Sequence, residues 1–212
     1  MAKINSDTVI HVFARIFSTI LSPLLMPSLG IFMAFWATVL CYIPTGTRLM
    51  VLLVIFGITC IMPMVVIAVL HNLKLIEDKR LVNRKERWMP YLATVLCYAG
   101  SAVYLYHIHT PQWAVVFLIG GTVACVVSLI VTFWWKISAH MAGIGGLLAF
   151  AVSIHLDGVG VIDMKLVICI LILLAGCLGT SRIFMRRHTF MQVLMGFING
   201  FLFVYLAGRL FA

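Results

Sequence analysis

The segment WAVVFLIGGTVACVVSLIVTFWW, residues Trp113–Trp135, decides the fold class of this chain. It contains no charged side chain, and an apolar run of about 17–25 residues is long enough to cross a bilayer as a helix. Inside a bilayer the backbone must satisfy its own hydrogen bonds, which a helix does. The segment therefore predicts a transmembrane helix.

The rest of the chain repeats this pattern. Hydrophobic residues make up 64% of the 212 residues and charged residues 10%, whereas about a quarter of the residues in soluble domains are charged. We therefore expect one membrane-embedded domain over residues 1–212, an all-α bundle of six or seven transmembrane helices. The apolar runs are Leu24–Ile43, Met50–Leu70, Met89–Tyr106, Trp113–Trp135, Met141–Ile154, Val161–Leu178 and Thr189–Leu210.

The residues before the first run predict a different kind of helix. Ser6 and Asp7 suit a helix N-cap, and the polar residues that follow recur at helical spacing among apolar ones. This pattern is typical of an amphipathic helix that lies at the membrane interface. No A-x-A-like cleavage site follows, so we do not expect a signal peptide. The recurring polar residues are Thr8, His11, Arg15 and Ser18.

The fifth run is short for a membrane span and rich in glycine. It covers Met141–Ile154 and holds Gly143, Gly145 and Gly146. Glycines at a helix surface allow close helix packing. We expect this helix to begin inside the protein and to pack tightly against its neighbours.

The six cysteines predict neither disulfides nor a metal site. All lie inside apolar runs and none forms a C-x-x-C pair, so we interpret them as small core hydrophobes.

Basic residues gather on one side of the predicted membrane. If each run crosses once, the N-terminus and the segments 71–88, 136–140 and 181–192 share a face, which we call the motif end. It carries 12 of the 15 lysines and arginines. Positive-inside bias would place this end in the cytoplasm, and it explains the net charge of +9 better than nucleic-acid binding does.

Three separated segments of the motif end carry residues that suit phosphate chemistry. They are Arg80-x6-Arg87-Trp-Met-Pro90, Lys136-Ile-Ser138-Ala139-His140 and Ser181-Arg182-x5-His188-x3-Gln192. Arginine offers a planar fork of donors to phosphate oxygens. Ser138 suits the N-cap of the fifth run, where backbone N–H groups would face an anion. Two histidines allow one to attack phosphorus and the other to protonate the leaving oxygen.

These segments resemble the motifs of the type 2 phosphatidic acid phosphatase superfamily, which read K-x6-R-P, P-S-G-H and S-R-x5-H-x3-D. The third motif matches in every specified residue except the last, where Gln192 replaces Asp. In the second, Ile137 and Ala139 replace Pro and Gly. In the first, Arg80 stands for Lys and Pro90 comes two residues late. The matched segments span about half of the chain.

The resemblance implies a metal-independent lipid phosphatase of the bacterial inner membrane, with no cofactor. It implies that His188 is the nucleophile and forms a phosphohistidine, that His140 is the general acid, and that Gln192 supports His188. The expected phosphate-binding residues are Arg80, Arg87, Ser138, Ala139 and Arg182. Bacterial relatives place this site on the outer side of the inner membrane, which conflicts with the charge bias above.

The expected activity is hydrolysis of a phosphomonoester or diphosphate on a membrane lipid. Polyprenyl diphosphate, a phosphatidate-like lipid and a lipid A phosphate are all possible substrates. The alternative is a protein that binds lipid phosphate with little or no turnover, as a sensor, carrier or scaffold. The altered second motif and Gln192 motivate this alternative.

Overall fold

The computed structural model describes residues 6–76 and 86–211, with side chains from residue 11 onward. Within these ranges the chain is helical, and no strand is assigned. The elements are α1 (Ser6–Ile20), η1 (Pro23–Leu25), α2 (Met26–Ala37), η2 (Val39–Tyr42), α3 (Thr45–Phe56), η3 (Gly57–Ile61), α4 (Met62–Asn72), α5 (Trp88–His107), α6 (Gln112–Thr132), α7 (Ala139–Leu156), α8 (Met164–Phe184) and α9 (Phe190–Phe211).

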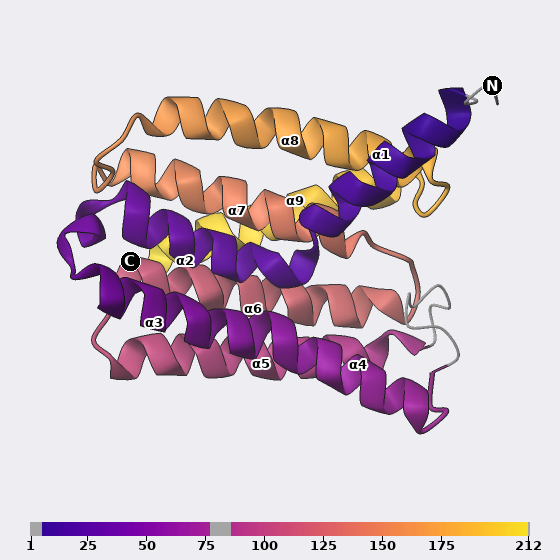
Figure 1. The fold of residues 1–212 in the computed structure, drawn as a ribbon, viewed down its shortest axis with the longest axis horizontal. Helices are drawn as coiled ribbons and strands as arrows, with labels where there is room; N and C mark the ends of the chain where they lie inside the picture. The colour runs from indigo at the N-terminus through magenta and orange to yellow at the C-terminus, as the bar shows by residue number, and fades with distance from the viewer. Residues whose placement is uncertain (1–5, 77–85, 212) are drawn as a thin grey trace, which may run out of the picture.

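The long helices run antiparallel in one bundle (Figure 1). The start of α1 and the C-terminal ends of α4, α6 and α8 lie at the right-hand end of Figure 1. The connections after α2, α5 and α7 lie at the other end together with the C-terminus. The structure therefore brings the described parts of the three motif segments to one end, as the count of apolar runs predicted.

In the described part of the chain, six helical stretches are long and apolar enough to cross a membrane, so the predicted all-α polytopic bundle is confirmed. They are His11–Ala37, Thr45–Asn72, Gln112–Thr132, Ala139–Leu156, Met164–Phe184 and Phe190–Phe211. The stretch Thr45–Asn72 joins α3 to α4 through the π-helical turn η3. The remaining apolar run forms α5, which packs between α4 and α6 in the same bundle.

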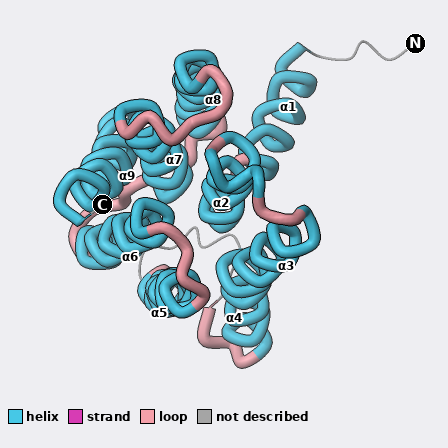
Figure 2. The backbone as a smooth tube through the Cα atoms, turned by 90° about the vertical axis from the view of Figure 1, so that its left-hand side faces the viewer, coloured by secondary structure: helices cyan, strands magenta, loops and turns pink. Residues whose placement is uncertain are grey.

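The helix α7 lies at the centre of the bundle. It packs against α9, α8, α2 and α6, as the end-on view in Figure 2 shows. Within its 18-residue apolar window 61% of the residues are buried, against 22% to 44% in the other five stretches. Its N-cap, Ser138, is fully buried, so α7 begins inside the protein, as its short apolar run predicted.

Glycines set the distance between α7 and α9. A Cβ atom on Gly145 would collide with the carbonyl oxygen of Phe197. A Cβ atom on Gly200 would collide in turn with the carbonyl of Ala142. The two backbones are therefore in direct contact, which confirms the close packing expected from the glycines of the fifth run.

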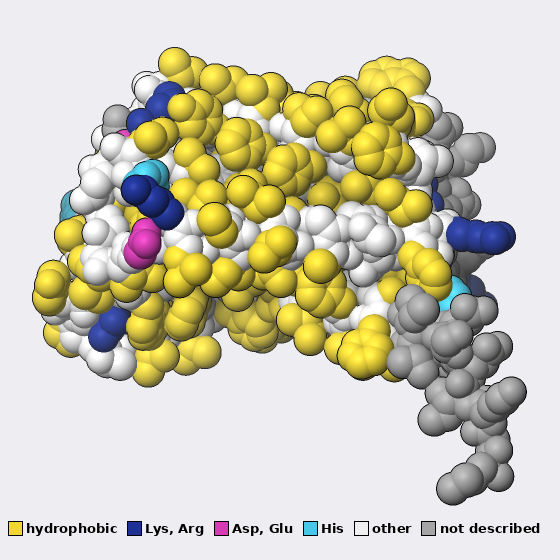
Figure 3. Space-filling view, turned by 90° about the horizontal axis from the view of Figure 1, so that it is seen from above, with side chains coloured by type: hydrophobic (Ala, Val, Ile, Leu, Met, Phe, Trp, Pro, Cys, Tyr) yellow, Lys and Arg dark blue, Asp and Glu magenta, His cyan; other side chains and the backbone are white. Residues whose placement is uncertain are grey.

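The surface is that of an integral membrane protein. Figure 3 shows a broad apolar middle and charged side chains gathered toward the two ends. Large side chains such as Leu53, Leu96 and Leu173 are each at least 65% exposed in that middle zone. Such exposure is expected where lipid rather than water surrounds the helices.

Candidate active site

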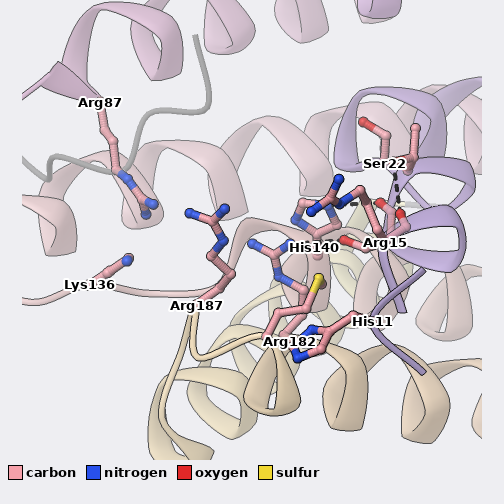
Figure 4. Close-up of a pocket in the computed structure, with 11 residues that line it drawn as sticks. His11, Arg15, Ser22, Arg87, Lys136, His140, Arg182 and Arg187 are labelled. Carbon is pink, nitrogen blue, oxygen red and sulfur yellow. Dashed lines mark hydrogen bonds between the residues drawn. The ribbon is translucent and has the colours of Figure 1, made fainter. Parts of the chain in front are cut away.

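The motif end contains a basic cavity of about 570 Å³ between α1, α7, α8 and the loop segments near Arg87 and Lys136 (Figure 4). No described residue that lines it is acidic. The lining residues are His11, Arg15, Ser18, Thr19, Ser22, Arg87, Lys136, His140, Arg182, Met185 and Arg187.

A second cavity of about 220 Å³ adjoins the first and contains both motif histidines. It shares Ser22, Arg87, His140 and Arg182 with the basic cavity. We call it the histidine cavity. Its other lining residues are mostly apolar and come from η1, α4, α5, α7 and the turn before α9: Pro23, Leu24, Ile67, Pro90, Tyr91, Thr94, Ala139 and His188.

Arg182 lies in the last turn of α8, where both cavities meet. Its Nη1 donates a hydrogen bond of 2.9 Å to the Ser18 hydroxyl of α1. Its Nε is buried and has no hydrogen-bond partner. A buried guanidinium donor without a partner is costly.

His140 lies in the first turn of α7 and also contacts Ser18. Its Nε2 is 3.1 Å from the Ser18 carbonyl oxygen. A backbone carbonyl only accepts hydrogen bonds, so Nε2 carries a proton and donates it. Ser18 thus bridges two of the residues expected in the site, one through its hydroxyl and one through its carbonyl.

His188 lies in the turn between α8 and α9 and is 7% exposed. Its Nδ1 is 3.2 Å from Oε1 of Gln192. The backbone N–H of Thr189 donates to the same oxygen over 3.2 Å. Because that N–H requires an acceptor, the amide oxygen faces His188 and Nδ1 carries the ring proton. The Nε2 of neutral His188 therefore retains its lone pair.

The surroundings of His188 favour its neutral form. Burial and the positive charges of Arg182, Lys136 and Arg87 lower the pKa of His188 to about 3. The pKa of Lys136 is lowered in turn by burial and by Arg87, Arg182 and Arg187. At neutral pH the site thus combines a neutral, nucleophilic imidazole with a cluster of cations.

Of the other expected phosphate ligands, some line the cavities and one instead supports the packing of the helices. Arg87 lines both cavities and Ala139 lines the histidine cavity. Ser138 caps α7 in position, but its side chain makes no capping hydrogen bond and lines neither cavity. Its backbone N–H donates to the Gln192 carbonyl over 3.2 Å, which fastens α7 to α9. Arg80 lies outside the described residues.

The basic cavity also contains residues that we did not expect there. His11, Arg15 and Ser18 of α1 form one wall, and Lys136 and Arg187 add two cations. The helical spacing of the polar α1 residues was visible in the sequence, but that pattern alone indicates only a polar face. The orientation of the polar face of α1 toward α8 depends on contacts between distant parts of the chain.

No group of three or more His, Cys, Asp or Glu side chains placed to hold a metal ion occurs in the described ranges. No protein-family model, curated protein or solved structure shows significant similarity to this chain.

Proposed function

We propose that the protein is a membrane lipid phosphatase that forms a phosphohistidine on His188, as its motif resemblance to the type 2 phosphatidic acid phosphatases implies. One observation carries the proposal: His140, His188, Arg87 and Arg182 line a single cavity at the motif end. This is the minimum set for the reaction, because it supplies a nucleophile, an acid and two cationic phosphate ligands.

In the first step, Nε2 of His188 attacks phosphorus while the bond from phosphorus to the lipid oxygen breaks. The Nδ1–H bond to Gln192 holds the ring and stabilises it as positive charge develops. His140 acts as the acid in its imidazolium form, which the negative charge of the bound phosphate stabilises. Its Nε2 proton, which points at the Ser18 carbonyl in the free protein, passes to the leaving oxygen and His140 is left neutral. Arg87 and Arg182 neutralise the charge on the transferring phosphoryl group.

In the second step, water attacks the phosphohistidine. The P–N bond breaks, inorganic phosphate leaves, and His188 is regenerated with its lone pair on Nε2. Neutral His140 receives the proton that the attacking water loses, which returns the enzyme to its starting protonation state.

We infer a lipid substrate because most other residues that line the histidine cavity are apolar. Pro23, Leu24, Tyr91 and Thr94 line both the histidine cavity and a mainly apolar cavity of about 100 Å³ deeper in the bundle. A phosphate head can meet the arginines while the first carbons of its tail contact these residues.

Phosphate release from a panel of lipid phosphates tests the proposal directly. Purified protein in detergent should turn over at least one lipid phosphate and accumulate a phosphoenzyme that survives base and is hydrolysed by acid. A chelator should change the rate little, and vanadate, which can mimic five-coordinate phosphorus, should inhibit. Loss of activity with chelator and recovery with Mg²⁺ would contradict the histidine mechanism.

The second candidate function is binding of lipid phosphate with little or no turnover. It is favoured by Gln192, which contacts His188 but supplies no negative charge to support the ring during phosphoryl transfer. Saturable binding of a lipid phosphate, combined with no phosphate release and no phosphoenzyme for any lipid of the panel, would establish this function instead.

We also propose a bacterial inner-membrane location with the motif end facing the cytoplasm, in keeping with its excess of basic residues. Single cysteines introduced by Arg186→Cys at the motif end and Ile162→Cys at the other end, in a background without native cysteines, test the orientation. Both positions are exposed. Labelling of only Ile162→Cys by an impermeant reagent in intact spheroplasts supports the proposal, and labelling of only Arg186→Cys refutes it.

A further inference from the structure

The basic cavity carries more positive charge than one phosphate at His188 requires. Five cationic side chains line it, and none of its described lining residues is acidic. Only Arg87 and Arg182 also line the histidine cavity. A phosphate there carries at most two negative charges, which these two arginines match. Arg15, Lys136 and Arg187 have no such role in the proposed reaction.

The helix α1 places Arg15, which is exposed, on the wall of this cavity. His11, Arg15 and Ser18 lie on successive turns of one helix face. The His11 ring packs against Phe184 of α8 with ring centroids 4.7 Å apart. Ser18 is 6% exposed and bonded to Arg182 and His140. Contacts one turn before and one turn after Arg15 therefore fix its place, and Figure 4 shows its side chain near His140 and Arg182.

Two of the three additional cations, Lys136 and Arg187, lie close enough to Arg87 and Arg182 for their charges to interact. The pKa of Lys136 is lowered first by burial and then by Arg87, Arg182 and Arg187. Like charges held together in a partly buried space repel, and a bound anion would relieve that repulsion. Arg182, whose buried Nε has no hydrogen-bond partner, lines both cavities.

We propose that Arg15, Lys136 and Arg187 form a second phosphate subsite next to the histidine cavity. The proposal rests on the proposed function for the identity of the first subsite. Its ligand is a phosphate group, either the second phosphate of a substrate head or the inorganic phosphate released by the reaction. Arg182, which lines both cavities, can contact both groups. Arginine suits this task because its fork binds two phosphate oxygens at once.

Binding of inorganic pyrophosphate and phosphate to the purified full chain in detergent tests the subsite. The variants are Arg15→Gln and Arg187→Gln, with Arg186→Gln as the matched control. Arg186 is the exposed neighbour of Arg187 and does not line the basic cavity. Calorimetry at constant ionic strength should show affinity for pyrophosphate about tenfold weaker in each test variant and unchanged in the control.

Kinetics distinguish the two sources of the ligand. If the subsite holds the second phosphate of a substrate head, the test variants lower kcat/KM for a lipid diphosphate and not for the monophosphate of the same lipid. If it holds released phosphate, they raise the inhibition constant of phosphate and leave both substrates unaffected. Either pattern supports the subsite. Equal behaviour of Arg15→Gln, Arg187→Gln and Arg186→Gln in binding and kinetics would overturn it.

The two proposals fail separately in these experiments. A protein that hydrolyses no lipid phosphate but binds pyrophosphate through Arg15 and Arg187 would refute the phosphatase and keep the subsite. An active lipid phosphatase in which the substitutions of Arg15 and Arg187 have no effect would refute the subsite and keep the phosphatase. Unfolding midpoints of all variants exclude misfolding, and Lys136→Gln replaces any arginine variant that does not purify as a monodisperse protein.

Discussion

The two ends of the bundle surround their arginines differently. At the end opposite the motifs, Arg209 donates to Asp157 over 2.7 Å. Arg48 at the same end donates to the Phe35 carbonyl over 3.2 Å and lies 4.8 Å above the Trp36 ring. These two cations have a carboxylate, carbonyl or ring partner supplied by the fold itself, although the Nε of Arg48, like that of Arg182, is buried without a hydrogen-bond partner.

At the motif end, the cationic side chains instead line the basic cavity. Arg15, Lys136, Arg182 and Arg187 line a cavity in which no described side chain is acidic. Of these, Arg182 is anchored by the neutral hydroxyl of Ser18. The comparison teaches that position at a membrane boundary does not by itself explain an arginine. Among the described residues, a carboxylate or ring partner distinguishes Arg209 and Arg48 from the cavity-lining cations, which we propose to bind an anion.

The largest difference between the ends should appear when a histidine is removed from each. His188→Ala should lower turnover by on the order of 10⁴-fold or more, because the nucleophile is lost. The matched change His155→Ala, at an exposed position of α7 near the other end, should leave turnover unchanged. Phosphate release and acid-quenched phosphoenzyme measure both. A phosphoenzyme that persists in His188→Ala would show that another residue is the nucleophile.

Removing the arginine shared by the two cavities should have the next largest effect. Arg182→Gln deletes a charged donor to the transferring phosphoryl group, so kcat/KM should fall by about 100-fold. It also removes the bond to Ser18, so the unfolding midpoint has to be measured beside the rate. Wild-type kcat/KM in folded Arg182→Gln would exclude this arginine from the reaction.

A smaller effect is expected at the residue that holds the nucleophile. Gln192→Leu removes the acceptor of the His188 Nδ1–H and should lower turnover by about tenfold or more, through loss of tautomer control. Gln192→Asp should keep or raise turnover, since a carboxylate accepts the same bond and adds charge. These rates, measured with saturating substrate, test the contact. If neither substitution alters a measurable rate, Gln192 does not support His188 during catalysis.

The buried histidine should also make stability depend on pH. The pKa of His188 is about 3 in the folded protein, against an ordinary value of 6.5. Below pH 6.5 the unfolded chain therefore binds a proton that the folded chain does not. The free energy of unfolding thus decreases as the pH is lowered from 6.5 toward 3. The slope from this group is at most about 1.4 kcal/mol for each pH unit. Denaturant unfolding in detergent at pH 7.5 and 5.0 should show a larger loss for wild type than for His188→Gln.

The smallest change is expected at the structural end. Arg209→Gln breaks an ion pair whose side chains are 31% and 28% exposed, and such pairs contribute about 0–1 kcal/mol. The unfolding midpoint should drop slightly while turnover keeps its wild-type value. A turnover defect as large as that of Arg182→Gln would mean that the two ends do not differ as described.

The sequence predicts the bundle well because its signal is local. The run Trp113–Trp135 became α6, Gln112–Thr132, with small shifts at the ends. Length and hydropathy determine such a helix within its own residues. The π-helical turn at Gly57–Ile61, inside one predicted span, was not foreseen because hydropathy carries no information about backbone winding.

The site was predictable only in part, for a related reason. Arg182, His140 and His188 could be placed together because helix parity brings their loops to one end. Ser18 could not, since its bond to Arg182 joins residues 164 positions apart. That contact depends on how α1 bends into α2. The polar face of α1 could contact either water or another part of the protein, and the amino-acid composition does not predict which.

The glycine contact between α7 and α9 has a consequence for which mutations the protein can tolerate. His140 lies at the start of α7 and His188 lies just before α9. The packing of these two helices therefore sets the distance between the two histidines. A methyl group added at Gly200 would collide with the carbonyl of Ala142, two residues after His140, and would push α7 and α9 apart there. Substitutions of the glycines along the contact between α7 and α9 should therefore impair the protein even where these glycines lie inside the membrane.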